Sequence, residues 1–410
     1  MTSWVSGDPQ RLGQGGGVSE REWRRVAPAM FMVAWGGNHF SPLLLLYREV
    51  ERYSAVQVDL FFAFYILGLV PGFLLAGPIS DRLGRRPLVV AALALGVVGS
   101  VVLALGSASP AALCAGRLVS GVSVATAMVA GTTWVKELSA AAPPGVRARR
   151  AALTLTVGFG LGAAVGAALA QWGPAPTLLP YAVQIALSLV AAVPLLRSSE
   201  TRPRGTHPAR PLGDELHLPP ASRPRFLRVV VPMAPWVFGA PALAFVVGPA
   251  LVAGRTAGHT VAFAGLAAVV TLAAGAGVQP VVPRLARLVR GRQAVVGLVL
   301  AALATGLLAL DVGLGSVVVA LCAAALLGTA YGICILTGLV ETQALADPER
   351  VAGLTGVYYS LIYVGFVLPV VLSELAAVAP EAWLLVLVAL VCLVCAAAVE
   401  RGLRTTTTPG

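Results

Sequence analysis

Two titratable side chains lie inside long apolar stretches of the sequence. Arg117 lies in the stretch 110–134, and His39 lies in the stretch 27–47 directly after Asn38. In helices that rise about 1.5 Å per residue, both positions are about 10–12 Å from one helix end. A guanidinium is costly to bury in apolar surroundings, and histidine exchanges a proton near neutral pH. We therefore expect Arg117 and His39 to face a shared cavity near the outer ends of their helices, in which His39 carries a proton.

Both residues also have purely structural interpretations. Arg117 could extend along its helix until its guanidinium reaches the membrane surface. A neutral His39 could form a hydrogen bond to a neighbouring helix. The sequence leaves these alternatives open.

A second group of chemically active residues separates two apolar stretches. It contains two glycines, an aspartate and three arginines at fixed spacing: Gly77, Asp81, Arg82, Gly84, Arg85 and Arg86. Glycine permits a tight turn, and arginine binds anionic phospholipid headgroups. Asp81, near a helix end, can bind an arginine or the N-terminus of another helix, and we expect the helix that begins near Val351 to be its partner. The alternative is a basic loop that only sets orientation, with an incidental aspartate.

The composition identifies the surroundings in which these residues act. Of the 410 residues, 58% are hydrophobic and 11% are charged, against about 25% charged in a soluble domain. So few charges cannot cover a soluble surface, which excludes a soluble enzyme, a nucleic-acid-binding module and a disordered protein. All five cysteines lie in apolar runs, so we expect no metal site, no disulfide framework and no cofactor.

Twelve apolar stretches are long enough to span a bilayer, which requires about 20 residues each. The sequence places them at 27–47, 58–78, 87–106, 110–134, 151–171, 177–197, 226–252, 258–282, 293–310, 315–340, 351–373 and 381–400. The fold class that follows is an all-α membrane protein.

The basic residues orient these spans. All but four of the 29 lysines and arginines lie on the side of the N-terminus, the exceptions being Arg48, Arg52, Arg117 and Arg255. Positive residues mark the cytoplasmic side, so we expect both termini in the cytoplasm and the protein in the inner (plasma) membrane. The net charge of +11 is then a signal of orientation, and we expect no nucleic-acid partner. The polar first 25 residues predict an uncleaved first span rather than a signal peptide.

The spans divide into two groups of six. We expect an N-terminal tail (1–25), a six-helix bundle (26–198), a linker rich in Pro and Arg (199–225), a second bundle (226–401) and a C-terminal tail (402–410). A faint repeat at an offset of 200 residues relates Gly77 to Gly277, with Val281 in place of Asp81. The two bundles should therefore be pseudo-symmetric.

The segment 77–86 closely resembles the signature loop between helices two and three of the major facilitator superfamily, and fills every fixed position of it. Arg117-x-x-x-Gly121 resembles the family's arginine and glycine in helix four, a pair associated with proton coupling. A third segment, 158–167, resembles the family's antiporter motif, but Ala163 and Ala167 replace its proline and its last glycine. The resemblance implies a secondary transporter whose halves rock against each other.

Polar and aromatic residues within the spans are the candidates for a substrate cavity. They are Asn38, Gln184, Trp236, Phe238, Gln279, Tyr331, Tyr358, Tyr359 and Tyr363. Packing between helices is the alternative role for each. Acidic residues are nearly absent from the middle of the spans, so the cavity should favour a lipophilic or amphipathic solute.

We therefore expect a monomeric transporter in the lipid bilayer that exports hydrophobic small molecules in exchange for protons. Uptake or facilitated diffusion of a polar metabolite is one alternative, and a non-transporting receptor or scaffold is another. The sequence has no phosphate-binding loop, so pumping driven by ATP is not expected.

Overall fold

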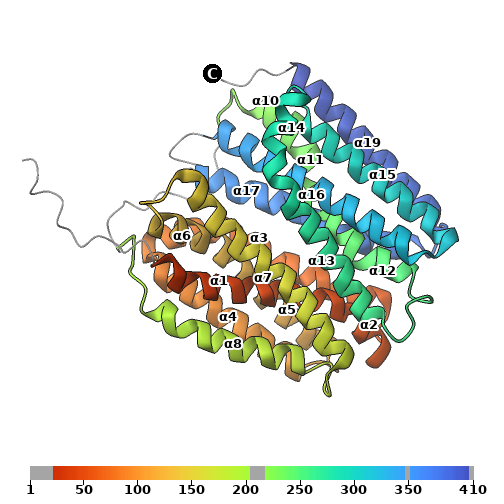
Figure 1. The fold of residues 1–410 in the computed structure, drawn as a ribbon, viewed down its shortest axis with the longest axis horizontal. Coiled ribbons are helices and arrows are strands. Elements are labelled where there is room, and N and C mark those ends of the chain that lie inside the picture. Colours follow the sequence, from red (N-terminus) through yellow and green to blue (C-terminus); the bar gives the residue numbers. More distant parts are fainter. Residues whose placement is uncertain (1–21, 204–217, 347–350, 406–410) are drawn as a thin grey trace, which may run out of the picture.

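The computed structural model describes residues 22–203, 218–346 and 351–405, and within them every regular element is a helix (Figure 1). Twelve helical segments are long and apolar enough to cross a membrane, which confirms the predicted all-α architecture of twelve spans. The predicted tails and linker lie partly outside the described residues, at 1–21, 204–217 and 406–410.

The first six spans precede the linker. They are α1 (Trp23–Asn38) with α2 (Phe40–Val50), α3 (Ala55–Leu83), α4 (Arg85–Leu105), α5 (Pro110–Thr126) with α6 (Thr132–Leu138), α7 (Pro144–Trp172) and α8 (Leu179–Leu196). A π-helical turn, Ala127–Gly131, joins α5 to α6. We call this group the first bundle.

The other six spans form the second bundle. They are α10 (Arg223–Arg225) with α11 (Val231–Ala242) and α12 (Gly248–Leu251), α13 (Thr260–Val278) with α14 (Val282–Leu288), α15 (Gln293–Leu314), α16 (Val317–Leu345), α17 (Val351–Tyr363) with α18 (Leu368–Leu375), and α19 (Glu381–Thr405). Short π-helical or 3-10 turns join the pieces of the broken spans.

The second span is longer than the sequence predicts, and this changes the signature loop. Ser54 begins α3 with a capping box that includes Gln57, and the helix continues through Asp81 to Leu83. The turn before α4 is Gly84 alone, whose φ of +101° is a conformation that side chains disfavour. Most of the predicted loop is therefore helix, and we call the side of the molecule with Gly84 the loop side.

The first span is broken at His39, between α1 and α2. Proline has no N–H to donate to the carbonyl four residues earlier, so Pro42 leaves the carbonyl of Asn38 free. The Asn38 side chain receives a hydrogen bond from Ser41 (3.0 Å) and donates one to the carbonyl of Phe159 on α7 (2.9 Å). These contacts hold the break against α7.

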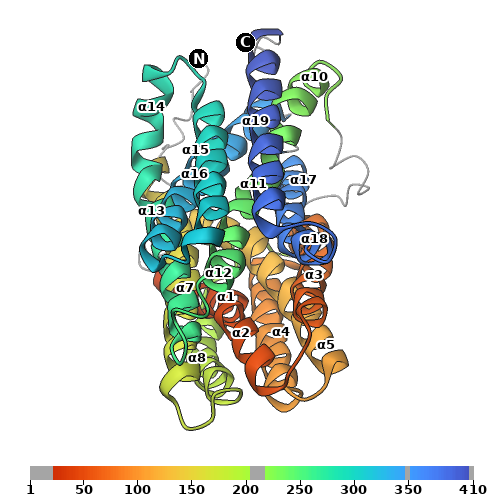
Figure 2. The ribbon, with the colours of Figure 1, turned by 90° about the vertical axis from the view of Figure 1, so that its right-hand side faces the viewer.

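The two bundles lie at an angle to each other (Figure 1). Their ends near α2 and α12 are close together, whereas the ends that carry α6 and α14 are apart. In the view turned by 90°, α13 and α18 lie against the first bundle (Figure 2), in agreement with contacts of α13 with α7 and α2 and of α18 with α3. The bundles therefore meet on the side opposite the loop side and along α3 and α17, whereas α6 and α14 diverge towards the loop side.

Helix α7 presents two different small-residue faces. Its glycines pack on α1, where a Cβ at Gly162 would lie 2.5 Å from the carbonyl oxygen of Trp35. Its alanines face the other bundle, where a Cβ at Gly265 of α13 would lie 2.4 Å from the Cβ of Ala167. The third sequence motif thus packs α7 within its own bundle and also against the other bundle.

The close approach of α7 and α13 gives a test of the contact between the bundles. We expect Gly265→Val to disfavour this arrangement by about 1–3 kcal/mol, because overpacking forces the backbones apart. The ratio of the arrangement seen here to other arrangements should fall about fivefold or more. Spin labels would be attached at Trp172→Cys and Ala257→Cys in a background without the five native cysteines. Double electron–electron resonance should then show a longer distance between the labels in Gly265→Val than in the unchanged protein. Gly277→Val is the matched control, since a Cβ at Gly277 meets nothing within 4 Å; the same distance distribution in both variants would contradict the prediction.

Candidate functional site

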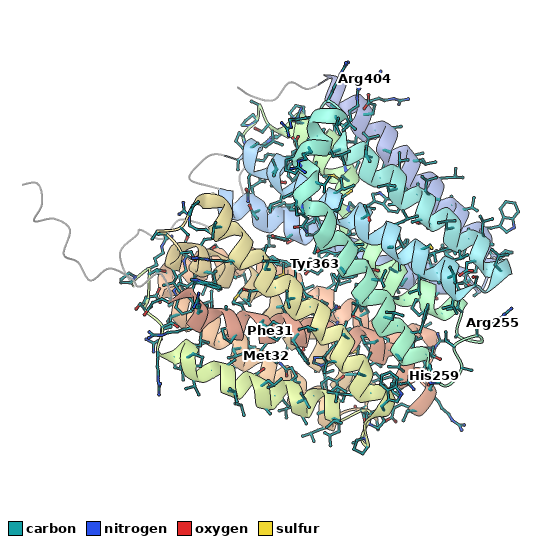
Figure 3. All side chains as sticks on the ribbon, viewed as in Figure 1. Phe31, Met32, Arg255, His259, Tyr363 and Arg404 are labelled. Atoms are coloured by element: carbon teal, nitrogen blue, oxygen red, sulfur yellow. The ribbon has the colours of Figure 1, made fainter. Side chains whose placement is uncertain are left out.

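A cavity of about 260 Å³ lies between the two bundles. Tyr363, which lines it, lies where the bundles meet, whereas Arg404 and the pair Arg255 and His259 mark opposite ends of the second bundle (Figure 3). The wall reaches the loop side at Lys136 and Gln279. The cavity is therefore a space at the bundle interface that extends towards the loop side.

Aromatic rings from both bundles form much of the cavity wall. The ring centroid of Phe238 on α11 is 4.2 Å from that of Tyr363 and 4.8 Å from that of Phe366. Phe366 also meets Phe62 of the first bundle edge-on at 4.7 Å. Rings in these arrangements attract one another beyond the apolar area they bury, so this cluster links the bundles at the depth of the cavity.

Arg117 lies in the cavity wall and is fully buried. Its Cζ atom is 4.3 Å from the ring centroid of Phe40 and 4.1 Å from that of Tyr65. A desolvated cation between two rings gains about 2 kcal/mol from each. None of its three guanidinium nitrogens has a hydrogen-bond partner among the described residues. The side chain is thus held by rings inside the bundle and does not extend to the surface.

The opposite side of the interface is closed by a side-chain amide. The Nε2 of Gln171, near the end of α7, donates to the carbonyl of Gly258 (2.7 Å). Its Oε1 accepts from the backbone N–H of Ala262 (3.2 Å), in the first turn of α13. One residue of the first bundle therefore satisfies orphan backbone groups at a helix start of the second bundle.

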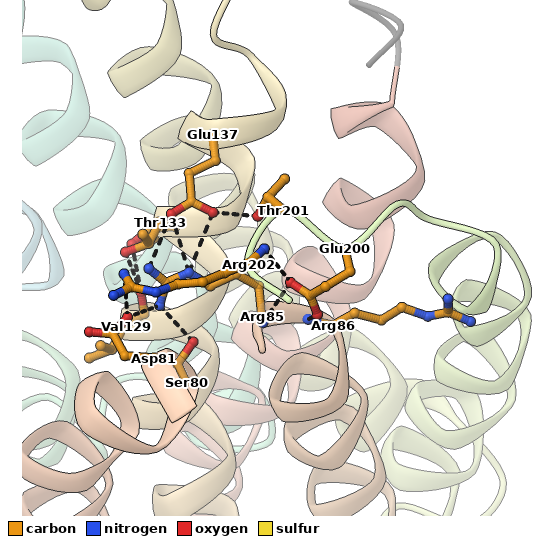
Figure 4. Close-up of polar contacts among 11 residues, drawn as sticks. Ser80, Asp81, Arg85, Arg86, Val129, Thr133, Glu137, Glu200, Thr201 and Arg202 are labelled. Atoms are coloured by element: carbon orange, nitrogen blue, oxygen red, sulfur yellow. Dashed lines mark hydrogen bonds and ion pairs between the residues drawn. The ribbon is translucent and has the colours of Figure 1, made fainter. Parts of the chain in front are cut away.

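Charged residues of the signature segment form a network on the loop side (Figure 4). The Asp81 carboxylate pairs with Arg85 (2.8 Å) and with Arg202 (2.7 Å). The buried guanidinium of Arg85 also pairs with Glu137 of α6 (3.1 Å) and donates to Ser80 (2.8 Å). Asp81 is thus bound to its own bundle and to the residues that follow α8; the expected contact with the start of α17 stays a prediction, since residues 347–350 before that helix lie outside the described residues.

Glu200 explains the glycine in this network. Its carboxylate accepts the backbone N–H groups of Arg85, Arg86 and Arg202, each at 2.9 Å. The first two begin α4, where a negative charge is favoured. A Cβ at Gly84 would lie 2.5 Å from Oε2 of Glu200, so the glycine makes room for this carboxylate as well as the turn.

Further contacts fasten the segment after α8 to the first bundle. The indole of Trp134 donates to the carbonyl of Ser199 (3.1 Å), and the N–H of Ser199 donates to Glu22 (3.0 Å). Burial alone would raise the pKa of Glu22, but the hydrogen bonds from Ser199 and the charge of Arg25 lower it overall. The contact is therefore present at neutral pH and is lost as the pH falls through the pKa of Glu22.

The sequence pattern of the Major Facilitator Superfamily matches residues 26–370. The chain belongs to the major facilitator superfamily. The family and its fold make the protein a membrane transporter rather than an enzyme, and the prediction of two related six-helix bundles is confirmed.

Solved structures of transporters share the fold. The nucleoside transporter NupG superposes with a TM-score of 0.70 at 14% identity, over 94% of this chain and 99% of that chain. A POT family transporter in complex with 5-aminolevulinic acid gives 0.74 at 12% identity, over 94% and 97%. A bacterial homologue of the lysosomal transporter Spinster, inward-facing and unoccupied, gives 0.65 at 16% identity, over 95% and 98%.

A curated relative is similar over part of its length. A probable polyol transporter of Arabidopsis thaliana is 30% identical over 122 residues, which are 30% of this chain and 24% of the relative. The match thus spans about a quarter of that protein.

The predicted site residues of this superfamily member fall into two groups. Seven of them line the cavity, and these are Asn38, Arg117, Phe238, Gln279, Tyr331, Tyr359 and Tyr363. The structure does not bring the others to the wall. His39 is fully buried, edge-on to Tyr181 at 4.9 Å, and Trp236 is buried on α11.

The remaining candidates have structural partners. Gln184 donates to Ser188 (3.0 Å) inside the first bundle, and the hydroxyl of Tyr358 donates to the carbonyl of Ile335 (3.1 Å). A Cβ at Gly121 would lie 2.1 Å from the carbonyl oxygen of Tyr65, so this glycine lets α5 approach α3.

Several residues of the site escape the sequence analysis. Phe62, Tyr65 and Phe366 look like ordinary core residues in apolar spans. Glu137 and Glu200 are acids on a strongly basic side, and that contrast is the one signal that could have found them. The second bundle repeats part of the pattern, since Glu341 near the end of α16 binds Arg225 through two contacts of 3.0 Å.

The geometry around Gly84 predicts a difference between two glycine substitutions. Gly84→Ala should lower the free energy of unfolding by about 0.5–2 kcal/mol more than Gly291→Ala, because it also displaces the carboxylate that caps α4. Gly291 is the matched control, with a φ of +81° and open space around its Cβ position. Thermal unfolding of the purified variants would measure this, and the extra loss should vanish in a Glu200→Ala background. Equal losses at both glycines would show that the carboxylate is not responsible.

Proposed function

We propose that the protein exports lipophilic or amphipathic compounds from the cell in exchange for protons, by alternating access to a cavity between its two bundles. The observation that carries this proposal is the cavity wall, in which aromatic and aliphatic side chains outnumber the other polar and charged ones. Such a wall suits solutes with a large apolar surface. The basic loops support an orientation in the inner membrane in which the loop side faces the cytoplasm.

Alternating access requires contacts that form in one state and break in the other. In the state described here, Gln171 and the α7–α13 contact close the side opposite the loop side. Among the described residues, the Asp81 carboxylate pairs with Arg85 of the first bundle and with Arg202 of the adjoining segment. In the other state, the start of α17 would approach Asp81, and the Gln171 contacts would break.

His39 is our candidate for the proton-carrying group. It occupies the break between α1 and α2, and neither ring nitrogen has a hydrogen-bond partner among the described residues. The ring of its neighbour Phe40 covers Arg117. A positive charge on His39, close to the charge of Arg117, would destabilise the arrangement in which the Phe40 ring covers Arg117. Protonation of His39 would therefore favour a rearrangement of the helices that enclose it.

A polar metabolite is the second candidate substrate. Asn38, Thr132, Thr156 and Gln279 supply hydrogen-bonding groups to the wall. The named relatives include polyol and nucleoside transporters.

Transport into proteoliposomes tests the proposed function directly. We expect steady-state accumulation of lipophilic test solutes in vesicles whose interior is about one pH unit more acidic to exceed accumulation without a pH gradient by about tenfold, because exchange of about one proton per solute couples the two gradients. The panel should also contain a polyol and a nucleoside. Polar solutes that move while lipophilic ones do not would favour the second candidate, and equal uptake with and without the gradient would contradict proton exchange.

The role of His39 predicts a specific loss. His39→Gln should abolish the acceleration by a pH gradient while solute exchange at equal pH stays within about twofold of the unchanged protein, because glutamine does not titrate. His259→Gln is the matched control, since His259 is exposed at the end of the second bundle that also carries Arg255 (Figure 3). An unchanged response to the gradient in His39→Gln would remove the histidine from the coupling mechanism.

A further inference from the structure

The charges that line the cavity have one sign. Arg117 and Lys136 are in its wall, and none of the described lining residues is an aspartate or a glutamate. The acid next in sequence to Lys136, Glu137, is bound to Arg85 and Thr201. The cavity therefore offers positive charge to a solute and, within the described wall, no carboxylate to oppose it.

The guanidinium of Arg117 has unsatisfied hydrogen-bonding capacity. An arginine side chain carries five N–H donors and stays charged at all relevant pH values. The rings of Phe40 and Tyr65 attract the cation but accept none of these donors in the plane of the guanidinium. The nearby hydroxyls of Tyr47 and Tyr181 are bonded to each other at 2.8 Å. A buried guanidinium without hydrogen-bond acceptors is costly, so the Arg117 guanidinium needs an acceptor from outside the described residues.

Arg117 lies beside the cavity, so a compound bound in the cavity could supply this acceptor. Tyr65, whose ring covers one face of the guanidinium, also lines the cavity. A rotation of this ring would bring the N–H groups to a solute in the cavity. Lys136 is exposed at the loop side of the same wall, where a positive charge attracts anions as they enter.

We propose that the compounds carried by this transporter are amphipathic acids, whose anionic group pairs with Arg117. The apolar body of such an acid lies against the aromatic cluster of Phe238, Tyr363 and Phe366. A carboxylate or sulfonate can accept two parallel N–H donors from one guanidinium. This assignment rests on the proposed function, because it specifies the class of solute that the same cavity takes.

Matched pairs of probes test the assignment. The protein in lipid nanodiscs would be titrated with 2-naphthoate, 2-naphthamide and 2-naphthylmethylammonium, and with dodecanoate and dodecanamide. We expect each acid to bind about tenfold more tightly than its amide, as a charge-assisted pair of hydrogen bonds would produce. Arg117→Gln should weaken binding of the acids about tenfold and leave the amides within about twofold, whereas Arg117→Lys should keep part of the preference.

Control variants and probes distinguish pairing of Arg117 with an anion from a role of Arg117 in helix packing. Arg255→Gln removes an exposed arginine at the end of the second bundle opposite Arg404 and should leave every affinity unchanged. Amides that weaken as much as acids in Arg117→Gln would mean that the arginine only supports packing, which would overturn the assignment. Acids that bind no more tightly than amides in the unchanged protein would overturn it as well.

The same probes distinguish this inference from the proposed function. If neutral or cationic probes accumulate in vesicles with an acidic interior and acids do not, the proposal of proton-coupled export stands and the assignment of Arg117 to an anion fails. If acids bind with the expected preference but no pH gradient drives their movement, the assignment stands and proton-coupled export fails. A protein that binds none of the probes contradicts both.

Discussion

An unpaired charge in apolar surroundings is costly, and this constraint shapes the whole molecule. On the loop side, charged residues that are partly buried are engaged by opposite charges, as Arg85 is by Asp81 and Glu137 and Arg225 is by Glu341. Arg117 is different, because it is more deeply buried than any of them and, within the described part of the chain, lies between two aromatic rings with no hydrogen-bond partner. The contrast separates arginines that stabilise one arrangement of helices from an arginine whose donors are still available. A transporter needs both kinds of arginine, since its helices must stay packed while groups in its cavity remain available to bind a solute.

The contacts between the bundles are of a kind that can be broken. On the side opposite the loop side they consist of small residues in van der Waals contact and one amide that bonds two backbone groups. Water can replace the hydrogen bonds of Gln171 once the bundles separate. The charged network around Arg85, by contrast, lies inside the first bundle and can move with it as a unit. The ion pairs named here therefore lie within a bundle, whereas the contacts named between the bundles are uncharged, a distribution that suits rocking of the two halves.

The sequence predicts the helices well because a span has a simple signature of length and hydropathy. It also finds the signature segment, whose charges stand out against an apolar background. It does not find the continuation of α3 through Asp81, because a charged helix end and a charged loop have similar compositions. Glu200 escapes because it acts on a helix start more than a hundred residues earlier in the chain. Trp236 and Tyr358 are predicted at the cavity because a nearly all-apolar span gives no periodicity to tell the cavity side from the packed side.

The two bundles share a plan but differ in charge where they face the loop side. Each has a glutamate near the end of its fourth span, Glu137 and Glu341, and each glutamate holds an arginine. Only the first bundle has an aspartate at the end of its second span, since Val281 occupies the related position. A carboxylate on one bundle alone can bind a helix start of the other without meeting a like charge. In the proposed other state, this departure from symmetry would give the loop side a directed contact, in which the first bundle supplies the charge and the second supplies the helix end.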